Sequence, residues 1–184
     1  MGDAYRGQES QCRCGFPSKS ERSTAVSRIN DLLDLDKIDS GMFNFKMQVH
    51  WVKPLIEQVI ETCQAYRAEL QVTLNYLPIG SDAQVYADSQ RLTQVLFNLV
   101  SNAIKFTARG TTVEIATEVV GQFMRVSVRD QGHGIPEHFK QRIFKKFSQS
   151  DSSDTRQKGG TGLGLAISKA LIDGMGGRID FVSE

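Results

Sequence analysis

The pattern of apolar positions predicts its clearest helix over residues 88–107. Seven apolar side chains recur there at spacings of three and four residues, which places them on one helical face: Leu92, Val95, Leu96, Leu99, Val100, Ala103 and Ile104. Asp88 or Ser89 can cap the first turn, and Gly110 follows the end. We therefore expect a long amphipathic helix that packs against a core.

Shorter patterns predict further elements on both sides of this helix. Alternating apolar and polar residues predict strands over 42–49, 71–76, 84–87, 112–119, 123–129 and 177–182. Helical spacing predicts helices over 54–69, 137–146 and 162–174. This order favours an α/β fold, a two-layer sandwich with helices on one face of a mixed β-sheet.

The N-terminal part of the chain has a different character. Residues 1–25 are polar and poor in aliphatic side chains, which is typical of a disordered or artefactual tail. Residues 26–41 carry apolar side chains at helical spacing and indicate one short helix, which needs a partner helix. Residues 42–184 then form the main domain.

Composition excludes several classes of protein. The 22 Lys and Arg residues nearly balance 21 Asp and Glu residues, which argues against a nucleic-acid binder. No apolar run approaches the roughly 18–20 residues of a membrane span, and the first residues lack a secretory signal. No second Cys or His pair accompanies Cys12 and Cys14, and three cysteines make no disulfide framework. We expect a cytoplasmic protein.

Three polar residues of the 88–107 helix form a candidate site. Asn98, Asn102 and Lys105 fall within about 60° of one another around the helix, at the edge of the apolar stripe. Amide oxygens are hard ligands suited to Mg²⁺, which also favours phosphate partners. A solvated helix face is the alternative interpretation, but Asn is a mediocre helix former and two in register call for a reason.

Two glycine-rich segments follow. In residues 130–136, Gly132 and Gly134 allow a sharp turn after a strand, where the Asp130 carboxylate can accept from the amine of a base. This short motif alone is common in turns. Residues 159–165 lead into a helix N-terminus, an arrangement that binds anions, although they match neither a Walker A loop nor G-x-G-x-x-G. The polar residues 148–161 before it indicate a lid.

Taken in this order, the segments resemble the catalytic ATP-binding domain of sensor histidine kinases in two-component systems, whose superfamily includes DNA gyrase and a chaperone ATPase. The resemblance covers residues 26–184. Residues 98–107 look like the N box, 130–135 the G1 box, 143–149 the F box and 159–165 the G2 box. Residues 28–41 resemble the end of the second dimerisation helix, and the stretch after Phe147 is most similar to hybrid-type kinases.

The resemblance implies a Bergerat-type fold that binds ATP with Mg²⁺. Asp130 would accept from the adenine amine, in a pocket shaped by Gly132, Gly134 and Ile135. The resemblance assigns catalysis to Asn98, Asn102 and Lys105, with Asn102, helped by Asn98, binding Mg²⁺. The other nucleotide-binding residues that it implies are Phe106, Phe147, Arg156, Gly160, Thr161, Gly162, Leu163 and Gly164.

The chain departs from the family pattern in two ways. None of its histidines, His50, His133 and His138, lies in the His-Glu/Asp-x-x-x-Pro setting of the phosphoacceptor. The usual last strand is also missing after residue 182. The resemblance therefore implies a kinase domain whose acceptor histidine is supplied in trans or lost by truncation. Its implied partners are the acceptor helix, a response regulator receiver domain and, in the parent protein, a second copy.

Two alternative functions stay open at this point. A gyrase- or chaperone-type ATPase would need a Glu general base where this sequence has Asn98. A nucleotide-binding or dimerisation module without transfer activity would fit the absent acceptor histidine.

Overall fold

The computed structural model describes residues 33, 34, 36, 40, 43–78, 80, 82–148 and 161–183. The predicted tail over 1–25, most of the helix over 26–41 and most of the predicted lid lie outside the described residues. The described elements, in chain order, are β1 (Gln48–Trp51), α2 (Val52–Thr62), α3 (Gln64–Leu70), β2 (Thr73–Pro78), β3 (Gln84–Ala87), α4 (Ser89–Phe106), β4 (Thr112–Val120), β5 (Phe123–Arg129), α5 (Glu137–Lys140) and α7 (Gly164–Gly174).

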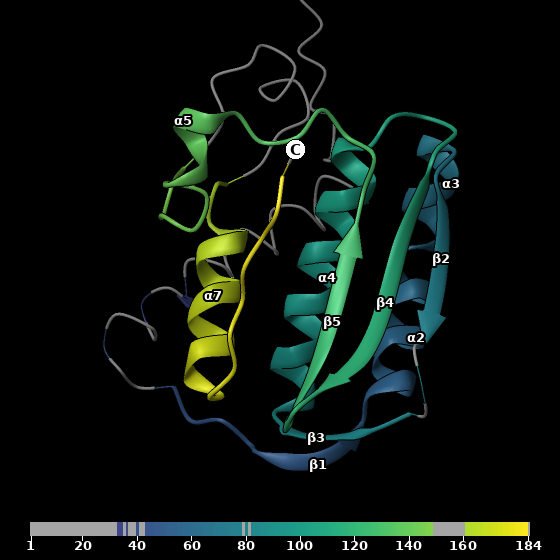
Figure 1. Ribbon diagram of the computed structural model, residues 1–184. Coiled ribbons are helices and arrows are strands. Elements are labelled where there is room, and N and C mark those ends of the chain that lie inside the picture. The colour runs from purple at the N-terminus through teal and green to yellow at the C-terminus, as the bar shows by residue number, and fades with distance from the viewer. Residues whose placement is uncertain are drawn as a thin grey trace, which may run out of the picture.

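The strands form a mixed sheet and a separate ribbon. β4 lies in the middle of a three-stranded sheet, parallel to β2 and antiparallel to β5. β1 and β3 pair antiparallel as a two-stranded ribbon. Figure 1 shows α2 and α4 behind the sheet, with α7 beside α4. The predicted two-layer α/β sandwich with helices on one face is confirmed.

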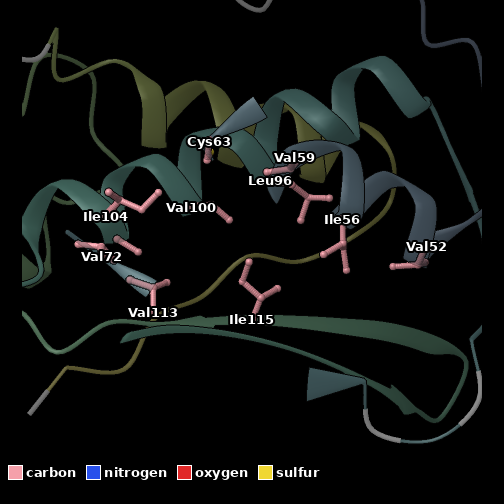
Figure 2. Packing of buried hydrophobic residues seen from close by; sticks show 11 residues of the cluster. Val52, Ile56, Val59, Cys63, Val72, Leu96, Val100, Ile104, Val113 and Ile115 are labelled. Carbon is pink, nitrogen blue, oxygen red and sulfur yellow. The ribbon is translucent and has the colours of Figure 1, made fainter. Parts of the chain in front are cut away.

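The main core lies between the helices and the sheet. Figure 2 shows Val113 and Ile115 of β4 pointing toward Val100 and Ile104 of α4, with side chains of α2 completing the cluster. Alternate residues of β4 are buried in this way, because successive side chains of a strand point to opposite faces. A second, smaller cluster joins α4 to α7. α4 thus contributes to both clusters and holds the layers together.

The predicted strand over 42–49 is wrong for most of its length, since only residues from Gln48 onward pair with another strand. Phe43 and Phe45 stack on each other at 5.3 Å and pack against the α4–α7 cluster. The backbone N–H of Lys46 donates to Asp88 rather than to a neighbouring strand. The alternation therefore reflects side chains packed onto helices, which a period of two cannot distinguish from a sheet.

Three other predicted elements need correction. The helix over 54–69 begins at Val52 and is two helices, because Cys63 departs from helical geometry at ψ −3°. The helix over 137–146 ends at Lys140, after which backbone hydrogen bonds span three residues instead of four. Residues 177–182 form no strand, and the N–H of Phe181 donates to the Asp180 side chain.

Candidate nucleotide-binding site

The polar stripe predicted on α4 exists and is internally bonded. The amide nitrogen of Asn102 donates to the amide oxygen of Asn98 at 3.4 Å, one helical turn away. Both side chains are half-buried. Lys105 follows in the last turn of α4, where a positive charge is favourable beside the free carbonyl groups of a helix end. Two amide side chains and an ammonium therefore line one edge of this helix.

The first turn of α7 lies against this stripe. A Cβ atom added to Gly164 would collide with the Asn98 amide oxygen, so any larger residue here would have to push that amide aside. One turn further along α7, the hydroxyl oxygen of Ser168 accepts a hydrogen bond from the Asn98 amide nitrogen at 2.9 Å. The N-terminus of α7, with its free backbone N–H groups, therefore opens beside the stripe.

The turn after β5 contacts the other end of α4. The Asp130 carboxylate accepts from the N–H of Gly132 at 2.8 Å, and a Cβ on Gly132 would lie 2.7 Å from the carbonyl oxygen of Phe106. Thr107 pairs with Gly132 in an isolated β-bridge, and its hydroxyl accepts from the N–H of Gln131 at 3.2 Å. The turn is thus tied to the α4 C-terminus, and its Asp130 side chain stays exposed.

Aromatic and cationic side chains lie between these two parts. The Phe106 ring meets the His133 ring edge-on at 6.3 Å, and the Lys105 ammonium lies 4.9 Å from the Phe106 ring centre. His133 is exposed, as expected for a turn residue. The half-buried Phe106 ring offers an apolar surface directly beside the predicted adenine and phosphate positions.

The segment before α7 is shaped by a left-handed backbone. Gly162 has φ +68°, and a Cβ there would lie 2.9 Å from the backbone of Phe147 and Ser148. The N–H of Leu163 donates to the Thr161 hydroxyl at 3.3 Å, and the Leu163 side chain is buried in the α4–α7 cluster. The polypeptide thus turns tightly into the helix start.

The remaining predicted site residues are more scattered. Gly134 and Ile135 belong to the turn after β5, and the N–H of Ile135 donates to the Ser183 hydroxyl at 2.7 Å. The Phe147 side chain is 67% exposed and its φ is +58°. Arg156 and Gly160 lie outside the described residues. The structure thus places the Asp130 turn and the start of α7 against α4, the helix that carries the polar stripe.

Two contributors were not predicted from the sequence. Ser168 and Thr107 are buried hydroxyl residues that hold Asn98 and the Asp130 turn, respectively. Ser168 gave a signal, since it is a polar residue on the otherwise apolar inner face of its helix, next to Ile167 and before Leu171. Thr107 gave none, because a polar residue after a helix end is ordinary.

Comparisons with known proteins agree with this geometry. Residues 87–184 match the family model described as histidine kinase-, DNA gyrase B-, and HSP90-like ATPase. The circadian input-output histidine kinase CikA of Synechococcus elongatus is 40% identical over 158 residues, which are 84% of this chain and 21% of CikA. The chain therefore spans about a fifth of this relative's length.

Solved structures give the same result. Full-length ShkA in complex with AMPPNP superposes with a TM-score of 0.73 and 26% identity, over 88% of this chain and 35% of ShkA. The histidine kinase ThkA in complex with the response regulator TrrA gives a TM-score of 0.64 and 25% identity, over 89% of this chain and 47% of ThkA.

The residues matched by the family model include α4, the Asp130 turn and α7, which are the elements that meet at the site. Among the described residues, no helix combines the length and apolar character that crossing a bilayer requires. The chain belongs to the family of histidine kinase-, DNA gyrase B- and HSP90-like ATPases, and it carries the ATP-binding catalytic domain found in sensor histidine kinases.

Proposed function

We propose that this chain binds ATP together with Mg²⁺ and transfers the γ-phosphoryl group to a histidine side chain in two-component signalling. In that reaction an imidazole nitrogen attacks the γ-phosphorus while the bond to the ADP oxygen breaks. Such transfer depends mainly on positioning and charge neutralisation. The protein therefore needs a site that holds adenine at one end and phosphates at the other.

One observation carries this proposal: both glycine-rich segments contact the same helix. Gly164 lies against Asn98, and Gly132 lies against Phe106. These two α4 residues are about 12 Å apart along the helix axis at 1.5 Å per residue. A single rigid element thus separates a base-binding turn from an anion-binding helix start by a fixed interval.

In this proposal the residues near the Asp130 turn bind the base, and those near the start of α7 bind Mg²⁺ and phosphate. The exposed Asp130 oxygen accepts from the adenine amine, with Gly134 and Ile135 beside it. Asn102, supported by Asn98, holds Mg²⁺, and the donor set fits because amide oxygens are hard ligands. Lys105 contacts phosphate. Bound Mg²⁺ supplies charge neutralisation on the phosphate oxygens.

The remaining phosphate contacts come from the residues around the α7 start. Thr161, Gly162, Leu163 and Gly164 surround this N-terminus. We include Arg156 and Gly160 in this group on their position in the sequence alone. Phe106 and Phe147 complete the nucleotide-binding set.

The acceptor histidine belongs to another segment in this proposal. His133 sits in the Asp130 turn, where its ring nitrogen Nδ1 contacts the Gly134 carbonyl oxygen at 2.9 Å. None of the three histidines has the sequence setting of a phosphoacceptor. We extend the proposal to an acceptor helix, a response regulator and a second copy of the kinase as partners. The complex of the similar kinase ThkA with a response regulator supports the response regulator.

Titration with a fluorescent ATP analogue, with and without Mg²⁺, tests the binding part of the proposal. Asp130→Asn should weaken binding at least about tenfold, because it removes a charge-assisted hydrogen bond. Asp82→Asn is the matched control, since Asp82 is an exposed carboxylate that also accepts backbone N–H groups. Asn102→Ala should remove most of the gain in affinity that Mg²⁺ gives.

Incubation with γ-labelled ATP and the purified dimerisation domain of a related histidine kinase tests transfer. We expect acid-labile label on the acceptor domain, and none with Asn102→Ala. Binding without any transfer would favour the nucleotide-binding module. Steady hydrolysis without transfer would favour the gyrase-type ATPase, although Asn98 offers an amide and not the carboxylate that activates water.

A further inference from the structure

Ser168 is a buried polar residue that the nucleotide chemistry does not explain. Its side chain is 2% exposed and lies on α7 between the buried residues Ile167 and Leu171. A hydroxyl in such a place is unfavourable unless it is hydrogen-bonded. The Asn98 amide nitrogen donates to the Ser168 hydroxyl oxygen at 2.9 Å.

This bond holds the Asn98 side chain in place, with its amide nitrogen engaged at Ser168. An amide group carries donors on its nitrogen and acceptors on its oxygen, so engaging the nitrogen at Ser168 turns the oxygen to the other side. That oxygen lies against Gly164 and accepts from the Asn102 nitrogen at 3.4 Å. A flip of Asn98 alone would place its amide nitrogen against that of Asn102, and neither nitrogen would then have an acceptor at this contact.

The order of donors and acceptors therefore runs in one direction, from Asn102 through Asn98 to Ser168. Because the Asn102 nitrogen is used by Asn98, its oxygen is directed away from Asn98. We propose that Ser168 is a positioning residue: through Asn98 it orients the Asn102 amide so that the oxygen is presented to the metal–phosphate end of the nucleotide. This inference rests on the proposed function and refines the support that Asn98 gives.

The first test is Mg²⁺-dependent nucleotide affinity in Ser168→Ala. Without the hydroxyl the Asn98 amide can rotate, and Asn102 loses its fixed orientation. We expect the gain in ATP affinity on adding Mg²⁺ to fall about threefold to tenfold, which corresponds to one hydrogen bond. Affinity without Mg²⁺ should stay as in the wild type, since the Asp130 turn is untouched.

A matched control separates this effect from general destabilisation. Thr117, in the middle strand β4 of the sheet, is another buried hydroxyl residue and is hydrogen-bonded to the Tyr76 hydroxyl at 3.3 Å. Thr117→Val should leave the Mg²⁺-dependent gain unchanged. In an Asn102→Ala background, Ser168→Ala should have no further effect, because the two residues act in series.

A second readout needs no nucleotide. The side-chain amide resonances of Asn98 and Asn102 in a ¹⁵N-labelled chain should both shift in Ser168→Ala, although it is Asn98 and not Asn102 that is hydrogen-bonded to Ser168. Unchanged Asn102 resonances, or a Mg²⁺-dependent gain equal to that of the wild type, would overturn the proposal. If the wild type fails to bind ATP while both resonances shift, the result would count against the proposed function. It would still support the coupling of Ser168 to Asn102 through Asn98.

Discussion

At the scale of single residues, two glycines matter because they lack a Cβ atom. Gly164 and Gly132 have no Cβ, and a polar atom of a neighbouring segment occupies the place where one would be. The close approach of α7 to α4, and of the Asp130 turn to α4, depends on these two absences. A methyl group at either position must displace an amide or a backbone carbonyl.

Gly164→Ala should therefore disturb both stability and the site. Because the new Cβ would collide with the Asn98 oxygen, we expect a loss of about 1–3 kcal/mol in the free energy of unfolding. Urea titration measures it. Gly177→Ala is the control, since its Cβ would meet the Cγ2 methyl of Ile172 at 3.1 Å, a tight contact but not an overlap. Equal losses in both variants would contradict the argument.

Cys63 makes stability depend on pH in the alkaline range. Burial raises the pKa of its thiol from 9.0 to about 11. Above pH 9 the unfolded chain ionises first and binds fewer protons than the folded chain, so the free energy of unfolding falls as pH rises toward 11. Thermal unfolding at pH 7 and pH 10.5 should show a larger drop in the wild type than in Cys63→Ala. Identical drops would count against this role.

At the scale of elements, the start of α4 is fixed by Asp88. Its carboxylate accepts from the N–H of Arg91 at 3.1 Å, which caps the helix, and from the N–H of Lys46 at 2.9 Å. Burial opposes ionisation, but these backbone N–H groups and that of Gln90 hold the pKa of Asp88 below its usual 3.8. The cap thus also secures the extended segment before β1.

Asp88→Ala should reduce the free energy of unfolding by about 2 kcal/mol, because it removes a helix cap and a second charge-assisted hydrogen bond. The lowered pKa means that the wild-type contribution is complete above pH 3.8 and is lost as pH falls through the folded-state value. Urea unfolding at pH 7 and pH 3 checks both statements. The difference between wild type and variant should shrink at pH 3, and a constant difference would be inconsistent with it.

The sequence predicted the elements where one period was long and unambiguous. α4 and the β4–β5 hairpin were predicted to within a residue or so, because their apolar spacing persists over many positions. The segment around Phe43 and Phe45 was predicted wrongly, since packing on helices produces the same alternation as a strand. The motif residues that meet on α4 were identified from their order. Thr107 emerges only from the tertiary contacts, and Ser168, a polar residue on an apolar helix face, gains its partner Asn98 only there.

At the scale of the whole molecule, an ion pair between Asp34 and Arg91 joins the segment that precedes the main domain to α4. Arg91 donates to both oxygens of Asp34 at 3.1 Å, and Gln94 donates to Asp34 at 2.8 Å. Asp34 is only 6% exposed, and the Arg91 guanidinium also lies 4.9 Å from the Phe43 ring centre. A buried carboxylate with three hydrogen bonds is strongly tied to this place.

A double-mutant cycle on Asp34→Asn and Arg91→Met should give a coupling energy of about 1–3 kcal/mol, because each single change leaves a buried polar partner unpaired. Urea unfolding of the four proteins measures it. The exposed pair Lys169–Asp173, at 3.1 Å, is the comparison and should couple by about 0.5 kcal/mol or less. A coupling energy as small as that of the exposed pair would contradict a strong attachment of Asp34 to α4.

The position of Arg91 on α4 has a mechanical consequence. The helix spans 18 residues, which is about 27 Å, and it carries the attachment to Asp34 near its first turn and Asn102 and Lys105 near its last. Because a helix is hydrogen-bonded along its whole backbone, it moves as a rigid rod. A tilt of a few degrees at one end of a rod about 27 Å long displaces the other end by about 1–2 Å. Displacements of that size are enough to misalign reacting groups, so a force applied to the chain through Asp34 would be transmitted to Asn102 and Lys105.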